Sequence, residues 1–138
     1  MDTQARANGH TATRACAQPM RVPSERTISL HFTDVSLANA LRDRIAADAP
    51  DRRIVVVDDL VQSVRACGTL VTSTTQCSPA ECAGLAEAGM HVIVLAAVPS
   101  EFQKGLYESA GAAAYLPMTL DLAPLIAAIK RVDPGGSP

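Results

Sequence analysis

The clearest structural signal in this chain is HVIVLAAVPSEFQKGLYESAGAAAYLPMTLDLAPLIAAIKRV, residues 91–132. It opens with a continuous apolar run at 91–97, which is typical of a strand covered on both faces. Ser100 and Gln103 then form a capping-box pattern, which predicts the start of a helix, and Gly111 has the place of its C-cap. The stretch therefore begins with a buried strand followed by a helix.

The rest of the stretch repeats this order. A strand is predicted at 112–116. Apolar residues then recur at helical spacing, and two cations follow in the last turn, where the helix dipole favours them: Leu122, Leu125, Ile126 and Ile129, then Lys130 and Arg131. In the preceding helix Phe102, Leu106 and Ala110 share one face, so we expect Phe102 and Leu106 to point into the core.

The same alternation extends upstream to Thr27. Strands are predicted at 27–32, 53–57 and 69–73. The helices between them are marked by apolar spacing or by caps: Leu37, Leu41 and Ile45; Leu60, Val61 and Val64, closed by Gly68; and the capping box Ser78-Pro79-Ala80-Glu81, whose helix ends at Gly89. Such units predict an α/β fold with a five-stranded, parallel, doubly wound sheet of the flavodoxin-like (βα)5 type in three α/β/α layers. For five units, 2-1-3-4-5 is the common strand order.

Length and composition limit the class of protein. The chain has 138 residues, enough for one domain, which we place at 27–132. Residues 1–26 are polar and aperiodic, so we expect a disordered leader there and a flexible tail at 133–138. A net charge of −2 gives no electrostatic reason to expect direct binding of nucleic acid. Without a secretory signal or a bilayer-spanning run, we expect a cytoplasmic protein with reduced cysteines.

Residues 27–132 resemble the receiver domain of bacterial two-component response regulators, most closely over 91–132 with its Ala-Gly-Ala turn and tyrosine-bearing strand. The resemblance implies a receiver-like fold and a role in phosphorelay signal transduction. It also implies a set of functional positions. These are an acidic pair ending the first strand, a phosphoacceptor aspartate ending the third, a serine or threonine ending the fourth, a switch aromatic residue in the fifth, and a lysine three residues after that aromatic.

The paired aspartates of this chain are out of place for that chemistry. Asp58 and Asp59 end the second predicted strand, so we interpret them as a loop acid and an N-cap for a short helix. Near the end of the first strand only Asp34 remains, as a residual pocket acid. Magnesium usually needs several carboxylate oxygens, so we expect no metal site.

The remaining functional positions are also degenerate. The phosphoacceptor position matches Thr75 when Ser78-Pro79 is taken as the family's Met-Pro-like pair, or Thr72 or Ser73 when the strand is counted. Ala96 stands at the position of the serine or threonine, and Met118 stands at that of the lysine, so neither matches. Tyr115 stands at the aromatic position and matches it. The sequence thus looks like a pseudo-receiver, an atypical response regulator without an aspartyl-phosphate switch. We expect it to be no enzyme and to need no cofactor.

We expect a stand-alone module that acts through protein–protein contacts. In receivers the fourth helix, fifth strand and fifth helix form the usual partner face, which matches 100–132 here. The partner would be a kinase, a transcription factor or a second copy in a homodimer. The interface candidates are aromatic and apolar: Tyr107, Tyr115, Leu116 and Met118, with Tyr107 and Met118 expected to be exposed.

Two other functions remain open. The 73–78 loop, STTQCS, places hydroxyls after a parallel strand and before a capped helix, where anions and small ligands bind. The candidates in this loop are Ser73, Thr74, Thr75 and Ser78. A flavodoxin-like enzyme fragment is the third interpretation.

Cys77 and Cys82 have a spacing within the loose zinc range but lack a second close pair, so Cys82 is interpreted as a small core residue.

Overall fold

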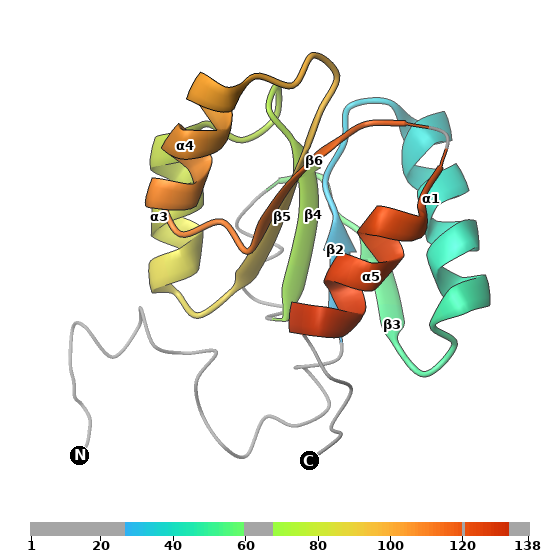
Figure 1. Cartoon of the computed structure of the whole chain (residues 1–138). Coiled ribbons are helices and arrows are strands. Elements are labelled where there is room, and N and C mark those ends of the chain that lie inside the picture. Colours follow the sequence, from blue (N-terminus) through green and yellow to red (C-terminus); the bar gives the residue numbers. More distant parts are fainter. Residues whose placement is uncertain (1–26, 60–67, 120, 133–138) are drawn as a thin grey trace, which may run out of the picture.

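The computed structural model describes residues 27–59, 68–119 and 121–132 (Figure 1). Its elements in chain order are β2 (Thr27–Leu30), α1 (Val35–Asp48), β3 (Arg53–Val56), β4 (Thr69–Ser73), α3 (Pro79–Glu87), β5 (His91–Ala96), α4 (Glu101–Ser109), β6 (Ala114–Pro117) and α5 (Ala123–Val132). Every strand and helix predicted within these ranges is present. The expected leader, the tail and the helix marked by Leu60, Val61 and Val64 lie outside the described residues.

The five strands form one parallel sheet in the order β3-β2-β4-β5-β6. Counted along the chain, this is the expected order 2-1-3-4-5. Helices α1 and α5 cover one face of the sheet, and α3 and α4 cover the other (Figure 1). The predicted doubly wound, three-layer architecture is therefore confirmed.

Alternate side chains of the inner strand β5 enter two separate hydrophobic clusters. In β5, Ile93 and Leu95 join the cluster beneath α1 and α5, while Val92 and Val94 join the cluster beneath α3 and α4. All four are almost completely buried. This two-sided burial explains why the strand reads as a continuous apolar run rather than as an alternating one.

Four predicted strands have different ends in the structure. The strands predicted at 53–57 and 91–97 each stop one residue earlier, at Val56 and Ala96. The first strand stops at Leu30, before residue 32, and the last runs over Ala114–Pro117 instead of 112–116. Gly111, after the end of α4, has a φ of 105°, a conformation that glycine adopts readily. The N–H of Ala112 then donates to the Tyr107 carbonyl at 3.0 Å. Residue 112 therefore still closes the helix, and the strand can begin only after it.

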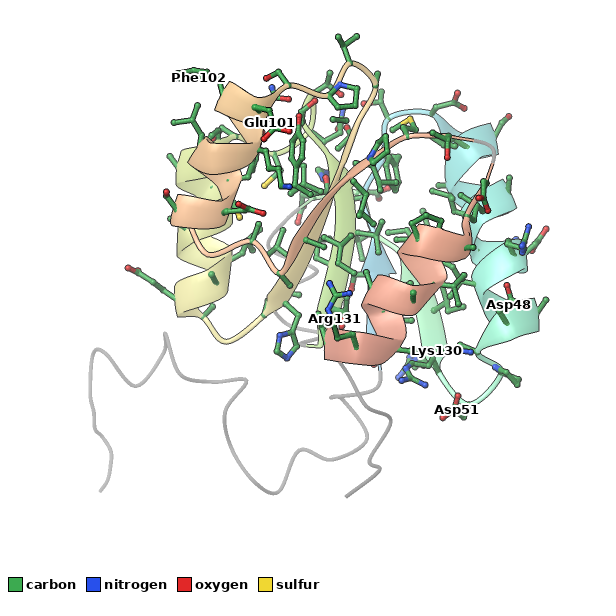
Figure 2. All side chains as sticks on the ribbon, viewed as in Figure 1. Asp48, Asp51, Glu101, Phe102, Lys130 and Arg131 are labelled. Atoms are coloured by element: carbon green, nitrogen blue, oxygen red, sulfur yellow. The ribbon has the colours of Figure 1, made fainter. Side chains whose placement is uncertain are left out.

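Helix α4 turns a different face to the core from the one predicted. Phe102 and Leu106 are exposed, whereas the side chain of Tyr107 is only 2% exposed. Phe102 projects away from the protein at the start of the helix (Figure 2). Tyr107 takes the inner position because its ring stacks on Tyr115, with centroids 5.9 Å apart, and its hydroxyl donates to the Cys77 carbonyl at 2.5 Å. A buried tyrosine needs such a hydrogen-bond partner, and helical spacing alone does not reveal it.

Candidate functional site at the carboxyl edge of the sheet

The carboxyl ends of β2, β4, β5 and β6 surround a pocket of about 230 Å³. In doubly wound sheets ligands bind at this edge, outside the ends of the strands. The strand ends, the loops after them and the first turn of α1 supply its lining: Phe32, Thr33, Asp34, Leu37, Ser73, Thr74, Thr75, Gln76, Ala97 and Met118. Of the positions that the sequence singled out, the fold brings together five in this pocket: Asp34, Ser73, Thr74, Thr75 and Met118.

Asp34 is the carboxylate of this pocket, and it already has a structural task. It is the N-cap of α1, and its Oδ1 accepts a hydrogen bond from the N–H of Leu37 at 3.2 Å. Asp58 and Asp59 follow β3 and do not line the pocket. The helix that Asp59 would cap lies outside the described residues.

Two of the three candidate phosphoacceptor positions lie in the pocket. The hydroxyls of Ser73 and Thr75 both line it and are 2.9 Å apart, within hydrogen-bond distance of each other. Thr72 is fully buried, and its hydroxyl donates to the His31 carbonyl at 3.1 Å. Thr72 is therefore no pocket residue, and Ser73 and Thr75 are the side chains that a ligand would meet.

Backbone donors of the 73–78 loop are largely used within the protein. The N–H groups of Gln76 and Cys77 both donate to the Ser73 carbonyl at 3.0 Å, and that of Thr74 donates to the Leu95 carbonyl at 3.1 Å. An anion in this loop would have to compete with these hydrogen bonds.

The predicted capping box at the start of α3 is confirmed. The N–H of Glu81 donates to Ser78 Oγ at 3.1 Å, and the N–H of Ser78 donates to Glu81 Oε1 at 2.9 Å. The negative carboxylate thus already lies at the helix N-terminus, the place that the anion hypothesis gave to a ligand.

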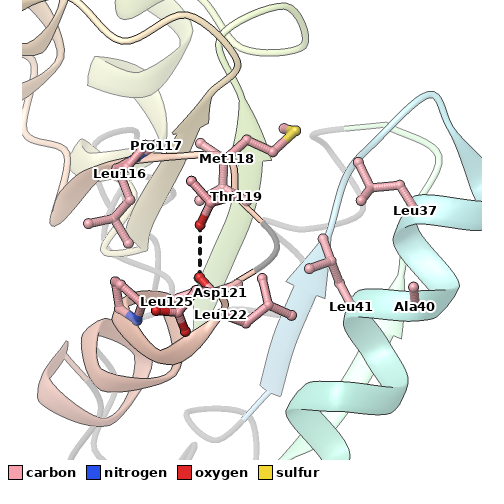
Figure 3. A pocket seen from close by; sticks show the side chains of 12 residues that line it. Leu37, Ala40, Leu41, Leu116, Pro117, Met118, Thr119, Asp121, Leu122 and Leu125 are labelled. Atoms are coloured by element: carbon pink, nitrogen blue, oxygen red, sulfur yellow. Dashed lines mark hydrogen bonds between the residues drawn. The ribbon is translucent and has the colours of Figure 1, made fainter.

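Met118 stands where the resemblance expects a lysine, and it separates two pockets. Besides the carboxyl-edge pocket it lines an apolar one of about 150 Å³ between α1 and the connection from β6 to α5. In Figure 3, Leu37 and Leu41 of α1 face Met118 and Leu122 across this second pocket. Leu37 also lines both pockets. Met118 packs partly buried against the core, so its predicted exposure is only partial.

Tyr115, the expected switch aromatic, is buried and tied to α4. Its hydroxyl donates to Gln103 Oε1 at 2.6 Å and accepts from the N–H of Ser100 at 3.2 Å. Ser100 Oγ in turn accepts from the N–H of Gln103 at 3.0 Å. Ala96, at the switch-hydroxyl position, is fully buried in the same cluster as Tyr115. The prediction that Ser100 caps the helix is confirmed, but the predicted capping box is not closed, because the Ser100 N–H donates to Tyr115 instead of the Gln103 side chain.

The interface candidates differ in accessibility. Tyr107 and Tyr115 are buried and Leu116 is half-buried. The expected exposure of Tyr107 is therefore wrong, because its ring and hydroxyl both have partners inside the protein. Any partner of this face would meet Leu116 and Met118 rather than the tyrosines.

Cys77 and Cys82 are buried free thiols of one core cluster. They flank the N-cap Ser78 at the positions N′ and N4, those of a hydrophobic staple. Burial, followed by the charges of Cys82 and Glu81, raises the pKa of Cys77 to about 12. Burial also raises the pKa of Cys82 and, as the largest of several causes, that of Tyr107. Thiols held in the neutral form pack as apolar groups.

Within residues 27–59, 68–119 and 121–132, no three His, Cys, Asp or Glu side chains gather closely enough to hold a metal ion. None of the helices in those ranges is both long and apolar enough to cross a membrane.

No family model matches the chain, and no curated protein matches it. Solved structures do. The NtrC4 receiver domain, determined as a beryllofluoride-activated dimer, aligns with a TM-score of 0.67 and 13% identity over 81% of this chain and 99% of that chain. A Burkholderia pseudomallei protein named as related to pilus assembly aligns with a TM-score of 0.66 and 20% identity over 84% of this chain and 95% of that chain.

A Burkholderia pseudomallei response regulator with a phosphorylated aspartate gives a TM-score of 0.63 and 12% identity over 75% of this chain. This chain spans 65% of that regulator's length. At such identities the likeness establishes the fold. The chain has the fold of response-regulator receiver domains.

Proposed function

We propose that this chain is a non-enzymatic pseudo-receiver, which serves bacterial signal transduction through protein contacts and lacks an aspartyl-phosphate switch. The observation that carries the proposal is the pair of hydroxyls of Ser73 and Thr75, 2.9 Å apart, in the pocket at the carboxyl edge. In a receiver an aspartate accepts the phosphoryl group at this edge, and an acyl phosphate forms only on a carboxylate.

The other groups around the pocket support the same proposal. Among the described residues that line it, Asp34 is the one carboxylate, and its Oδ1 caps α1. Magnesium prefers several oxygen ligands, and one capping carboxylate is a poor start for such a site. Met118 offers no positive charge to balance a phosphoryl group, and Ala96 has no hydroxyl to report one.

Without a phosphorylation switch, the module must pass on its signal through a surface that is always present or that is shaped by the binding of a ligand or partner. We propose that a cytoplasmic protein partner, such as a kinase, a transcription factor or a second copy, contacts residues 100–132. Among the similar structures, one is a receiver dimer and another is named as related to pilus assembly. Assembly of a pilus is accordingly one process in which such a module would serve.

The test is a search for phosphorylation chemistry by amide NMR. Acetyl phosphate or beryllofluoride, each with Mg²⁺, should leave the signals of Thr75 and Ala96 unchanged, because the candidate acceptor positions carry hydroxyls and no carboxylate. An ordinary receiver under the same conditions is the positive control. Saturable, Mg²⁺-dependent shifts of Thr75 and Ala96 would sink the proposal.

A second candidate is a sensor of anions or small ligands at the 73–78 loop. The hydroxyl-lined pocket of about 230 Å³ favours it. The internal hydrogen bonds of Gln76 and Cys77 count against it. Titration with inorganic phosphate separates the two candidates, since only the sensor predicts saturable shifts confined to this loop.

A further inference from the structure

The apolar pocket between α1 and the connection from β6 to α5 enters the layer of helices that covers one face of the sheet (Figure 3). Protein interiors are close-packed and leave few voids larger than one water molecule. This pocket has a volume of about 150 Å³, and a space of that size with aliphatic walls is large enough to hold a benzene ring. The pocket is therefore a site for an occupant larger than water.

The floor of the pocket is the hydrophobic core itself. Leu41 of α1, Leu95 of β5 and Leu125 of α5 all line it, and each is at most 3% exposed. In Figure 3 the leucines of α1 face Met118 and Leu122 across the space. An occupant would thus contact aliphatic side chains from both helices and from an inner strand, and it would be removed from water.

The polar side chains of the pocket are already engaged at its mouth. Thr119 and Asp121 are the polar residues among the described residues of the lining, and both are exposed. The Thr119 hydroxyl donates to the Asp121 carbonyl at 2.9 Å, and Asp121 Oδ1 accepts from the N–H of Ala123 at 3.0 Å. The deeper part offers water no polar side chain, and the carboxylate at the mouth disfavours an anion. Both features favour a neutral, apolar occupant.

The rim of the pocket decides between a small molecule and a protein partner. Protein partners cover contiguous apolar surfaces of several hundred Å². None of the four exposed large apolar side chains in the described ranges lines this pocket. The exposed residues of its lining are small, polar or proline: Ala40, Pro117, Thr119, Asp121 and Pro124. The opening therefore lacks the apolar surround that a protein interface needs, and the apolar surface lies inside, where only a small molecule reaches it.

We propose that this pocket binds a neutral, compact hydrocarbon about the size of toluene. The ring would lie among the leucines of the floor. Met118 forms part of the wall, and its flexible thioether adapts to small substituents on the ring. The inference goes beyond the proposed function and is independent of it, because it does not involve the hydroxyls of Ser73 and Thr75.

The experiment is a titration of the full chain, with isotope-labelled leucine and methionine methyl groups, with toluene. The methyl signals of Leu37, Leu41, Leu122 and Met118 should shift saturably in NMR spectra, with a Kd of about 1 mM or tighter, since small ligands bind efficiently for each of their atoms. Benzoate carries a carboxylate in place of the methyl group of toluene. It should leave these signals unchanged, because its charge would be buried among aliphatic side chains.

Two alanines of α1 provide a matched pair of variants. Ala40 lines the pocket from the exposed side of the helix. Ala47 is also exposed but does not line the pocket, and it lies about two helical turns further along the same side. Ala40→Phe should place a ring in the opening and weaken toluene binding at least tenfold, whereas Ala47→Phe should leave the Kd unchanged. Both positions are exposed, so both variants should stay folded, which circular dichroism checks.

Several results would overturn the inference. They are a titration that does not saturate, equal shifts with benzoate, or equal weakening by Ala47→Phe. Shifts at Leu106 in place of the pocket leucines would assign toluene to the exposed side of α4 instead. A silent toluene titration removes this inference alone, whereas Mg²⁺-dependent shifts of Thr75 and Ala96 remove the proposed function.

Discussion

The hydroxyl of Tyr115 donates to Gln103 Oε1 across 2.6 Å and thereby takes part in the cap of a helix that lies in another layer of the fold. In an ordinary capping box the side chain at N3 accepts directly from the N-cap N–H. Here the Ser100 N–H donates to the Tyr115 hydroxyl, and this hydroxyl in turn donates to Gln103 Oε1. The start of α4 is thus fixed by β6.

Tyr115→Phe should therefore destabilise the protein by about 1 kcal/mol, because it leaves the Ser100 N–H without its acceptor. Urea denaturation followed by circular dichroism measures the loss. A double-mutant cycle with Gln103→Ala is the control, with an expected coupling of at least about 0.5 kcal/mol. If the losses of stability in the two single variants simply add up in the double variant, the hydrogen bond between Tyr115 and Gln103 contributes nothing to stability.

Two threonines of β4 form a natural matched pair. Thr69 and Thr72 are both fully buried, but Thr72 donates to the His31 carbonyl whereas the Thr69 hydroxyl has no partner among the described residues. We expect Thr69→Val to stabilise the protein by about 1 kcal/mol and Thr72→Val to destabilise it by a similar amount. Chemical denaturation of both variants gives the two signs. Equal signs would contradict the assignment of the hydrogen bond.

The pKa of Cys77 predicts a dependence of stability on alkaline pH. The folded value is raised from 9.0 to about 12, so the unfolded chain loses its thiol proton first as the pH rises. The stabilisation of the folded state that comes from the raised pKa of Cys77 is fully present below about pH 9 and is lost progressively toward pH 12. Unfolding midpoints measured across that window should fall, and Cys77→Ala should reduce the slope. An unchanged slope in Cys77→Ala would assign the effect to other groups.

Two glycines should respond to alanine in opposite ways. Gly111 has a φ of 105°, and an added methyl would lie 2.8 Å from Ala86 Cβ. Gly111→Ala should cost about 1–3 kcal/mol through backbone strain. Gly84 is helical and open, so Gly84→Ala should stabilise by about 0.5–1 kcal/mol. Thermal unfolding of the two variants gives the comparison, and a tolerated Gly111→Ala would argue against the close approach of α3 to this turn.

Sequence analysis predicted those parts of the fold that depend on neighbours along the chain. Ser78 and Glu81 are three residues apart, so their capping box is visible in the sequence. The apolar run at 91–97 reflects burial on both faces, which a single strand also reveals. Strand order followed from a general preference for this number of units.

The features that sequence analysis missed depend on residues distant in sequence. Phe102 is the more apolar residue and was expected inside, but Tyr107 reaches the Cys77 carbonyl, thirty positions away, and takes the buried place. Thr72 could be told from Ser73 as a pocket residue only after the His31 carbonyl was located beside it. Such choices are made by partners that meet only when the sheet has formed.

Leu37 and Met118 each line both the hydroxyl-lined pocket and the apolar pocket, and this shared wall has a thermodynamic consequence. A rotation of the flexible methionine that widens one pocket narrows the other. Occupants of the two pockets would therefore show negative cooperativity, and linkage requires each to weaken the other by the same factor. A compound found to bind either pocket would report on the free volume of both.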